Sequence, residues 1–173
     1  MKLNVLITQL RRYLKFLAVY LVAGVIIWLV ANTGSVQAAP EALKITVYRD
    51  PSCSCCGGWM EHLNTQGFQV KNVLTSDMNA LKQQYRVPND LASCHTAVIN
   101  GYVIEGHVPA NDIKRLIAEK LNAAGIAVPG MPIGTPGMES KNVRDPFSVF
   151  SFDQKGEAEA FNQYSFYADK SVS

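Results

Sequence analysis

The chain has no surplus of positive charge outside its N-terminus. Four of its 16 Lys and Arg residues lie in the first 38 positions, which contain no Asp or Glu. Residues 39–173 therefore carry 12 basic and 14 acidic side chains. Without a basic surplus or an Arg-rich stripe, this part lacks the electrostatic footprint of a nucleic-acid-binding protein. We expect no nucleic acid among its partners.

The sequence also lacks internal repeats and any linker that would divide the chain after residue 38. Residues 39–173 are enough for one domain with a hydrophobic core of its own. We therefore predict a single domain over residues 39–173.

The first 38 residues have the composition of a targeting segment. Basic side chains precede an apolar run over residues 16–30, and small residues follow as far as Ala38. We predict a signal peptide over residues 1–38, cleaved after Ala38. An uncleaved anchor is the alternative, because the run approaches the roughly 20 residues that cross a bilayer. Both interpretations predict an extracytoplasmic, periplasmic domain that meets a membrane only through this segment.

Cysteine is scarce, yet Cys53, Cys55 and Cys56 lie within four positions of one another. Four cysteines in an exported domain usually form two disulfides. A bridge between Cys55 and Cys56 would distort the peptide, and one between Cys53 and Cys55 would close a very tight ring, since bridged Cα atoms are typically about 5.5 Å apart. Only Cys53 with Cys56, or one of the three with Cys94, gives a comfortable bridge.

Hydrophobic patterns predict alternating strands and helices after residue 42. The predicted strands cover 43–48, 68–74, 96–99 and 102–105, and the predicted helices cover 58–65, 77–85 and 109–124. Asn100-Gly101 is a strong signal for a hairpin between the third and fourth strands. The resulting β-α-β-α-β-β-α order predicts an α/β fold with a mixed sheet, and it matches the order of elements in the thioredoxin fold. In thioredoxin-like proteins the working cysteines follow the first strand, where Cys53 and Cys56 form a C-x-x-C here.

A Pro/Gly-rich extension follows the last predicted helix. Residues 128–138 cannot form regular structure, and we predict an ordered surface loop that carries Met131 and Met138. Alternation over residues 147–152 predicts one more strand, before a short polar and aromatic tail.

The cysteine cluster is predicted to lie at a helix N-terminus, which stabilises negative charge and lowers thiol pKa. Disulfide exchange between Cys53 and Cys56 does not need Cys55, which would compete for the mixed disulfide. A metal site would gain a ligand from it. Soft thiolate and thioether ligands select Cu(I), with zinc and iron-sulfur clusters as competitors. Inert thiols or structural disulfides are the alternative.

Cys94 and His95 lie where thioredoxin-like proteins usually carry a cis-proline that faces the cysteine loop. We therefore predict that both approach the cluster, although an isolated pair of this kind is more often a buried thiol beside a hydrogen-bonded histidine. His107 ends the second hairpin strand, where a lone histidine is usually a surface or capping group. Met131 and Met138 have little core to fill on their loop, so we count them as thioether candidates.

Five motifs occur in an order that resembles the CopG-like copper-resistance family, much of which is described only as a domain of unknown function. They are Cys53-Ser-Cys-Cys56 with Gly57-Gly-Trp59, Ser93-Cys-His-Thr-Ala97, Gly101-Tyr, Glu105-Gly-His-Val-Pro109, and Val128-Pro-Gly-Met-Pro132 through Gly134-Thr-Pro-Gly-Met-Glu139. The resemblance runs from about Leu43 to Tyr164. It implies a thioredoxin-like extracytoplasmic domain whose C-x-C-C motif binds more than one copper ion, and a role as a copper oxidoreductase. Ser54 stands where this family often has glycine.

Together these observations predict a copper-binding protein of copper resistance and homeostasis. Cys53, Cys55 and Cys56 would hold Cu(I) in a thiolate-bridged cluster, with Cys94 and His95 completing the pocket. The second-rank ligands, which would accept Cu(II) or pass Cu(I) to another periplasmic copper protein or an exporter, are His107, Met131 and Met138. The alternatives are a thiol-disulfide oxidoreductase that uses Cys53 and Cys56, and a structural zinc or iron-sulfur site.

Overall fold

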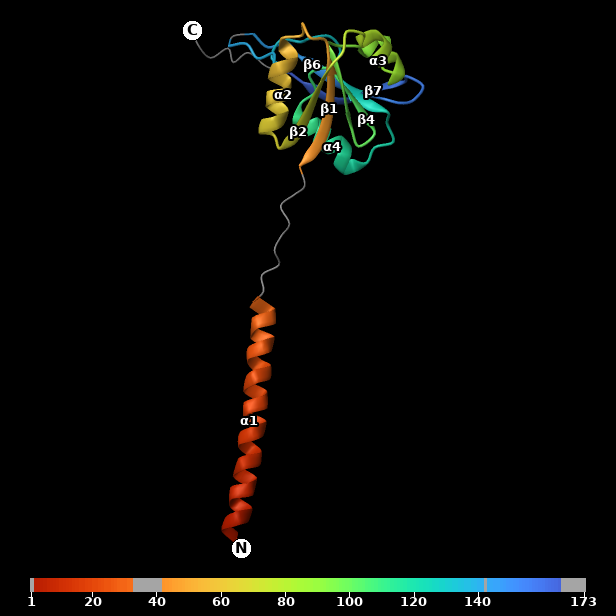
Figure 1. Cartoon of the computed structure of the whole chain (residues 1–173). Helices are drawn as coiled ribbons and strands as arrows, with labels where there is room; N and C mark the ends of the chain where they lie inside the picture. Colours follow the sequence, from red (N-terminus) through yellow and green to blue (C-terminus); the bar gives the residue numbers. More distant parts are fainter. Residues whose placement is uncertain (1, 33–41, 142, 166–173) are drawn as a thin grey trace. The chain divides into compact units, whose positions relative to one another are not determined.

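The computed structural model describes residues 2–32, 42–141 and 143–165 (Figure 1). It divides into two compact units, Met1–Glu41 and Ala42–Ser173. Each unit is described by itself.

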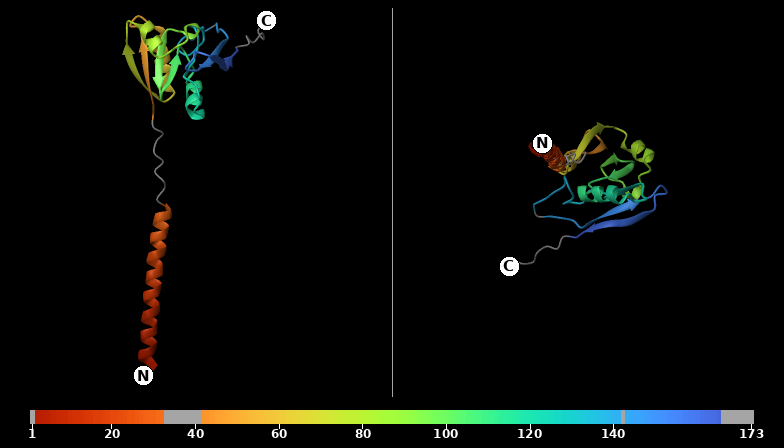
Figure 2. Two further views of the ribbon diagram at one scale, coloured as in Figure 1. Left: turned by 90° about the vertical axis from the view of Figure 1, so that its right-hand side faces the viewer. Right: turned by 90° about the horizontal axis from the view of Figure 1, so that it is seen from below.

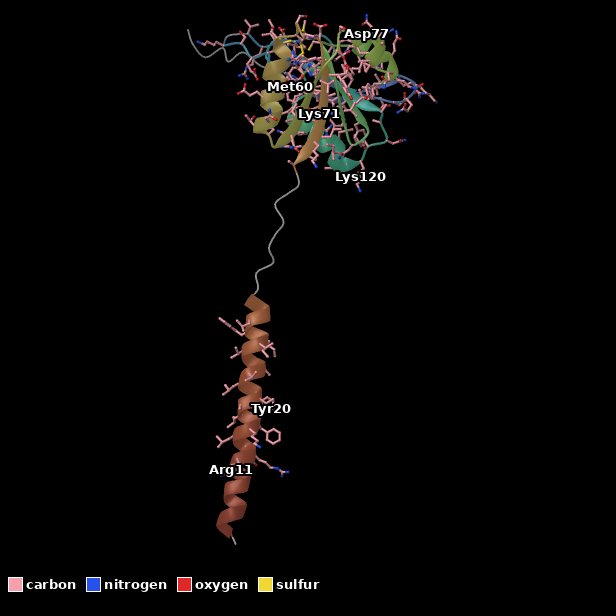
Figure 3. The ribbon with its side chains drawn as sticks, viewed as in Figure 1. Arg11, Tyr20, Met60, Lys71, Asp77 and Lys120 are labelled. Atoms are coloured by element: carbon pink, nitrogen blue, oxygen red, sulfur yellow. A yellow bond between two sulfur atoms is a disulfide. The ribbon has the colours of Figure 1, made fainter. Side chains whose placement is uncertain are left out.

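The first unit is one helix, α1 (Lys2–Asn32). Its segment Arg11–Leu29 has a mean hydropathy of 1.7, so α1 is long and apolar enough to cross a membrane by length and composition alone. A signal sequence near the N-terminus has the same properties. Side chains such as Arg11 and Tyr20 project outward from it (Figure 3). The cleavage predicted after Ala38 lies outside the described residues.

The second unit contains a seven-stranded sheet in the order β2-β1-β3-β4-β5-β6-β7. Figure 2 shows the ribbon of this unit from two further directions. The elements are β1 (Leu43–Arg49), α2 (Cys55–Thr65), β2 (Phe68–Leu74), α3 (Met78–Gln84), the 3-10 turn η1 (Asn89–Leu91), β3 (His95–Ile99), β4 (Tyr102–Glu105), α4 (Ala110–Glu119), β5 (Gly125–Ala127), β6 (Phe147–Phe152) and β7 (Ala158–Tyr164). β1 pairs in parallel with β2 and antiparallel with β3, so the sheet is mixed. The predicted α/β class with a mixed sheet is confirmed.

The hairpin predicted at Asn100-Gly101 is confirmed. β3 and β4 pair antiparallel, with Ile99 opposite Tyr102. Asn100 and Gly101 both have positive φ, at 48° and 85°. Two consecutive positive φ values are what a two-residue type I′ turn requires, and Asn-Gly adopts them readily.

The structure departs from the sequence prediction in three places. α2 begins at Cys55 rather than near Gly58, so two of the cysteines belong to its first turn. α4 ends at Glu119, because Lys120 takes a left-handed φ of 49°, instead of continuing to residue 124.

The third departure is at the C-terminus, where the structure has three strands and the pattern indicated one. β5 is only three residues long and fully buried, so it has no alternation to detect. β7 replaces the predicted tail and pairs with β6 as an outer strand of the sheet, with no regular alternation of buried and exposed residues. The strand predicted over residues 147–152 is confirmed as β6, and the predicted order beyond α4 lacked β5 and β7.

Two hydrophobic clusters cover opposite faces of the sheet. Ile104 and Val103 are neighbours in β4 and belong to different clusters, and neighbouring strand residues point to opposite faces. The larger cluster contains Trp59 and Leu63 of α2 and also residues of α4. Trp59 is fully buried, and its indole Nε1 donates a hydrogen bond to the Val108 carbonyl at 2.8 Å. The first turn of α2, with its cysteines, is thereby fixed on the core.

Candidate metal centre

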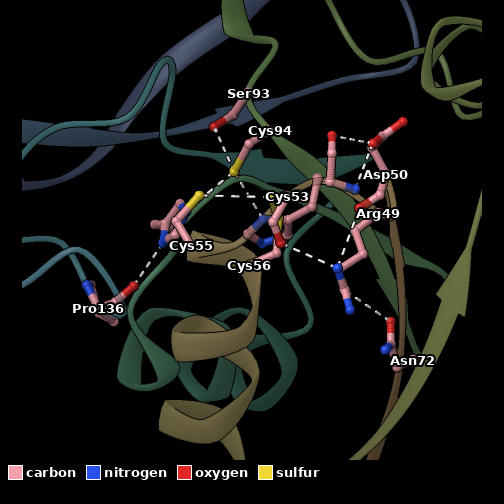
Figure 4. The surroundings of a disulfide bond; sticks show 12 residues. Arg49, Asp50, Cys53, Cys55, Cys56, Asn72, Ser93, Cys94 and Pro136 are labelled. Carbon is pink, nitrogen blue, oxygen red and sulfur yellow. Dashed lines mark hydrogen bonds between the residues drawn. A yellow bond between two sulfur atoms is a disulfide. The ribbon is translucent and has the colours of Figure 1, made fainter. Parts of the chain in front are cut away.

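The cysteine loop between β1 and α2 is held by local hydrogen bonds. The Arg49 guanidinium donates to the carbonyl oxygens of Cys53 and Asp50, at 3.2 and 3.3 Å. Cys53 N donates to the Asp50 carbonyl at 3.1 Å, and the Asp50 carboxylate accepts from Ser52 N at 2.8 Å. Figure 4 shows Arg49 reaching from the end of β1 toward this loop. The cysteine backbone is therefore constrained before any metal binds.

Cys53 and Cys56 form a disulfide, with their Cα atoms 5.7 Å apart. It is one of the two kinds of bridge that the spacing allowed. Cys55 and Cys94 are free and half-buried. The structure therefore represents an oxidised form, in which two of the four sulfurs are bonded to each other.

The four cysteine sulfurs nevertheless gather at one point, within 4.8 Å of one another. Cys53 Sγ and Cys55 Sγ are 3.7 Å apart. Cys94 is the residue immediately before β3, and β3 pairs with β1 so that His95 lies opposite Arg49. The end of β1 and the start of β3 are thus adjacent, and Cys94 faces the cysteine loop (Figure 4).

Two imidazoles also contact Cys94. Its Sγ lies 3.1 Å from His95 Nδ1 and 3.2 Å from His107 Nε2. One potential ligand atom from each of these three residues lies within 4.8 Å of those from the other two. Cys94 therefore belongs to two groups of potential ligands, one of four thiols and one of a thiol with two imidazoles.

The environment of His107 fixes its tautomer. His107 Nδ1 lies 2.7 Å from the carbonyl oxygen of Pro136. A carbonyl only accepts, so Nδ1 carries the proton and the Nε2 lone pair faces Cys94. Metal-binding histidines are typically oriented by such a hydrogen bond on the other ring nitrogen. His107 is fully buried, unlike the surface or capping histidine that is usual at a strand end.

His95 is fully buried as well, with its ring centroid 4.3 Å from that of Trp59 and 5.1 Å from that of His107. Within the described residues, its Nε2 has no hydrogen-bond partner. Buried polar atoms are nearly always paired, and those that are not often mark a functional site. Burial holds the pKa of His95 well below its ordinary value, and the charges of His107 and Lys82 act in the same direction. Burial also lowers the pKa of His107. Both imidazoles are thus neutral near pH 7, which is the form that binds metals.

Cys94 differs from a cysteine at a helix N-terminus. Burial, reinforced by the neighbouring Cys55, raises the pKa of the Cys94 thiol to about 12. Without metal it is a neutral thiol at physiological pH. A metal ion that binds Cys94 must therefore displace its proton.

The Pro/Gly loop over residues 128–138 closes the site, a contact that the sequence did not predict. A Cβ atom on Gly137 would lie 2.3 Å from the backbone nitrogen of Trp59, and one on Gly58 would lie 3.0 Å from the Cα of Gly137. The loop backbone and the first turn of α2 therefore touch, and glycine is needed on both sides. Pro136, next to Gly137, supplies the carbonyl that orients His107.

The structure brings some of the predicted ligand residues together and leaves the ligation of others untested. The structure brings together the four cysteines and the two histidines His95 and His107. Met138 is half-buried beside Gly137, whereas Met131 is 53% exposed. Ligation by either methionine stays a prediction.

Sequence reasoning missed two residues that hold the site in place, namely Arg49 and Pro136. Both act through a backbone carbonyl, Arg49 as a donor and Pro136 as an acceptor. The signal for Pro136 was its place in the last motif of the resemblance.

Comparison with known proteins finds one family and two solved structures that are similar to this chain. Residues 91–138 match the model of a family described as "Protein of unknown function, DUF411". Two solved structures of a copper resistance protein copG, in two forms, are each 44% identical to this chain. Form 2 has a TM-score of 0.70, and the match covers 72% of this chain and all of the other; form 1 has a TM-score of 0.68, with 72% and 98% covered. No curated protein matches.

Proposed function

This chain belongs to the CopG-like copper-resistance family, and on that premise we propose that it is an extracytoplasmic protein that binds Cu(I) in a thiolate-bridged cluster. Cys53, Cys55 and Cys56 would supply the bridging thiolates once the disulfide is reduced. Cys94, His95 and His107 would complete the ligand set. Copper is the cargo of this site, in copper resistance and homeostasis.

The observation that carries the proposal is the shared position of Cys94. Its sulfur lies within 4.8 Å of three other sulfurs and also within 4.8 Å of two imidazole nitrogens. A thiolate has spare lone pairs and can bind two metal ions at once. The arrangement therefore favours more than one ion over a single tetrahedral ion, with Cys94 as a further bridge between the two groups of ligands.

The chemistry of the donors favours copper over its competitors. Thiolates are soft ligands that select Cu(I), and imidazole accepts either copper oxidation state. A site with both kinds of donor can hold Cu(I) and Cu(II), which is the basis for a role in copper redox chemistry. A structural zinc site would instead make folding depend on the metal. This domain has an extensive core of its own, so its fold does not require that contribution.

The disulfide gives the site a dependence on redox state. Two electrons and two protons convert the Cys53–Cys56 bridge to two thiols, and copper then displaces the thiol protons. In the disulfide form two of the four cysteines, Cys55 and Cys94, remain as thiol donors beside the two imidazoles. We expect the reduced chain to bind more copper than the oxidised chain.

The extracytoplasmic location and the transfer of copper belong to the same proposal. The apolar helix α1 supports export, as a periplasmic signal peptide or as an anchor. Met131, which is exposed, and Met138 could pass Cu(I) to another periplasmic copper protein or an exporter. The position of a C-x-x-C motif at the start of the first helix after β1 supports a thioredoxin-like relationship.

A thiol-disulfide oxidoreductase is the second candidate, and the disulfide itself favours it. Cys53 and Cys56 are bridged at the start of α2, and the free Cys55 sulfur lies 3.7 Å from that of Cys53. This function predicts disulfide reduction without metal that survives in a Cys55→Ser variant. The copper function predicts instead that Cys55→Ser weakens Cu(I) binding.

A Cu(I) titration of the reduced chain against a competing chelator tests the proposal. The matched control is the triple variant Cys53→Ser, Cys55→Ser and Cys56→Ser. We expect tight binding of at least two ions by the natural chain and fewer by the variant. Equal binding by both proteins would contradict the proposal.

A further inference from the structure

A buried carboxylate lies behind the Cys94-His95 dipeptide. The Glu105 side chain is fully buried at the end of β4, directly opposite Thr96 of β3. One of its oxygens accepts from Ser93 N at 2.7 Å and from Lys82 Nζ, and the other accepts from the Thr96 hydroxyl at 2.6 Å. Lys82 Nζ also donates to Thr96 Oγ1 at 3.1 Å. The Glu105 carboxylate therefore binds all three of the other groups in this network.

Glu105 binds two residues that flank the proposed copper ligands Cys94 and His95. Ser93 comes immediately before Cys94, and Thr96 comes immediately after His95. Both ends of this four-residue segment are thus attached to a single carboxylate. Between them, the His95 carbonyl accepts from Gly106 N at 3.0 Å. The positions of Cys94 and His95 relative to His107 consequently depend on Glu105.

The backbone around this carboxylate is packed closely. Gly106 has a φ of 73°, and a Cβ atom there would lie 2.5 Å from the Ser93 hydroxyl and 2.6 Å from the Val128 carbonyl. The Ser93 hydroxyl also donates to the Gly130 carbonyl. The Ser93 end of the segment is therefore held from two sides, by Glu105 and by the loop that closes the site.

Stability alone gives little reason for a buried ion pair here. Replacing such a pair with apolar residues of similar volume is often neutral or stabilising, because both charges must lose their hydration. Groups that orient metal ligands have a different effect, since their loss typically lowers metal affinity 10- to 100-fold. We propose that Glu105 is a positioning residue that holds Cys94 and His95 in the geometry in which they bind copper together with His107. This role rests on the proposed copper function.

A second buried carboxylate provides a matched control. Asp112 of α4 is 3% exposed and accepts from Asn162 Nδ2 at 2.8 Å and from the Tyr164 hydroxyl at 2.7 Å. It thus attaches β7 to α4 and binds neither Ser93 nor Thr96. Asp112→Asn and Glu105→Gln each replace a buried carboxylate with the corresponding amide. Glu105→Gln alone should disturb the segment that carries Cys94 and His95.

The test compares the natural chain, Glu105→Gln and Asp112→Asn at full length in the reduced state. Cu(I) affinity is measured with a competing chelator, and the imidazole nitrogens of His95 and His107 are followed by NMR in the same samples. A glutamine keeps the shape of glutamate but has one accepting oxygen, so it cannot accept from Ser93 and Thr96 through separate oxygens. The NMR signals report on ligation itself and not on stability.

We expect Glu105→Gln to weaken the binding of the copper ion held by His95 10- to 100-fold and to abolish the shift of the His95 nitrogen at copper levels that still fill the other cysteines. Asp112→Asn should match the natural chain in both measurements. An unchanged affinity and an unchanged His95 shift in Glu105→Gln would overturn the role of Glu105 alone. A natural chain that binds no Cu(I) would overturn the copper function and this role with it.

Thr96→Val keeps the test decisive if Glu105→Gln does not fold. It removes the hydroxyl that binds Glu105 and leaves the Lys82 pair in place, with nearly the same side-chain shape. A weakened His95 signal in this variant supports the role of Glu105, and a natural signal refutes it.

Discussion

The proton on Cys94 gives the copper site a pH dependence that can be worked out from the structure. The triple variant Cys53→Ser, Cys55→Ser and Cys56→Ser leaves Cys94, His95 and His107 as one group of ligands. Burial, the leading cause of the raised Cys94 pKa, remains in this variant. Both imidazoles are held neutral by burial, so copper binding releases one proton, from Cys94.

The magnitude follows from the fraction of thiolate. An unperturbed thiol with a pKa of about 8.5 gains about 30-fold in thiolate between pH 7 and pH 9.5. A thiol with a pKa well above 10 gains about 300-fold over the same range, because it stays mostly protonated throughout. We therefore expect Cu(I) affinity to rise about tenfold per pH unit, or about 1.4 kcal/mol, without flattening below pH 9.5.

The assay is a competition titration of this variant at several pH values, with a chelator whose own protonation is known. A matched variant that also carries Cys94→Ser should lose most of the affinity and the pH dependence. A profile that flattens near pH 8.5 would refute the reasoning that Cys94 is a buried neutral thiol.

Three further predictions concern the same site. The disulfide form should bind fewer Cu(I) ions than the chain reduced with a phosphine, and equal stoichiometry by mass spectrometry would contradict the requirement for free Cys53 and Cys56. Gly137→Ala should lower the free energy of unfolding by at least about 2 kcal/mol in denaturant titrations, because Gly137 has a φ of 81° and a Cβ there would meet the backbone of Trp59. A Cβ at Gly57 would enter open space, so the control Gly57→Ala should be neutral or stabilising. Equal stability of the two variants would refute the packing argument. His107→Ala should lower the affinity for the imidazole-bound copper ion more than tenfold. The control is His62→Ala, which should not lower it, because the Nε2 of His62 accepts a hydrogen bond from Ala110 N. Equal losses of affinity in both variants would argue against ligation by His107.

The first half of the fold follows from local signals, because its strands and turns have strong patterns. The predicted strand over residues 43–48 is rich in apolar and β-branched residues, and Asn100-Gly101 specifies the hairpin between β3 and β4. β5 and β7 could not be predicted in the same way. The first is too short to show a period, and the second depends on pairing with β6 rather than on its own pattern.

The candidate site could be predicted only as far as local sequence reaches. The cysteine loop and the Cys94-His95 dipeptide were both identified, since each follows directly from a motif. The burial of His107 depends on a loop about thirty residues further along the chain, which supplies the Pro136 carbonyl. The Glu105 network likewise joins residues from α3, β3 and β4, and no local pattern indicates it.

X-ray absorption at the copper edge of the reduced, Cu(I)-loaded natural chain tests the central claim most directly. A thiolate-bridged cluster places copper ions next to one another, so the account predicts sulfur ligands together with copper–copper scattering at two or more ions per chain. Copper held by isolated sites, with no copper neighbour at full loading, would contradict it.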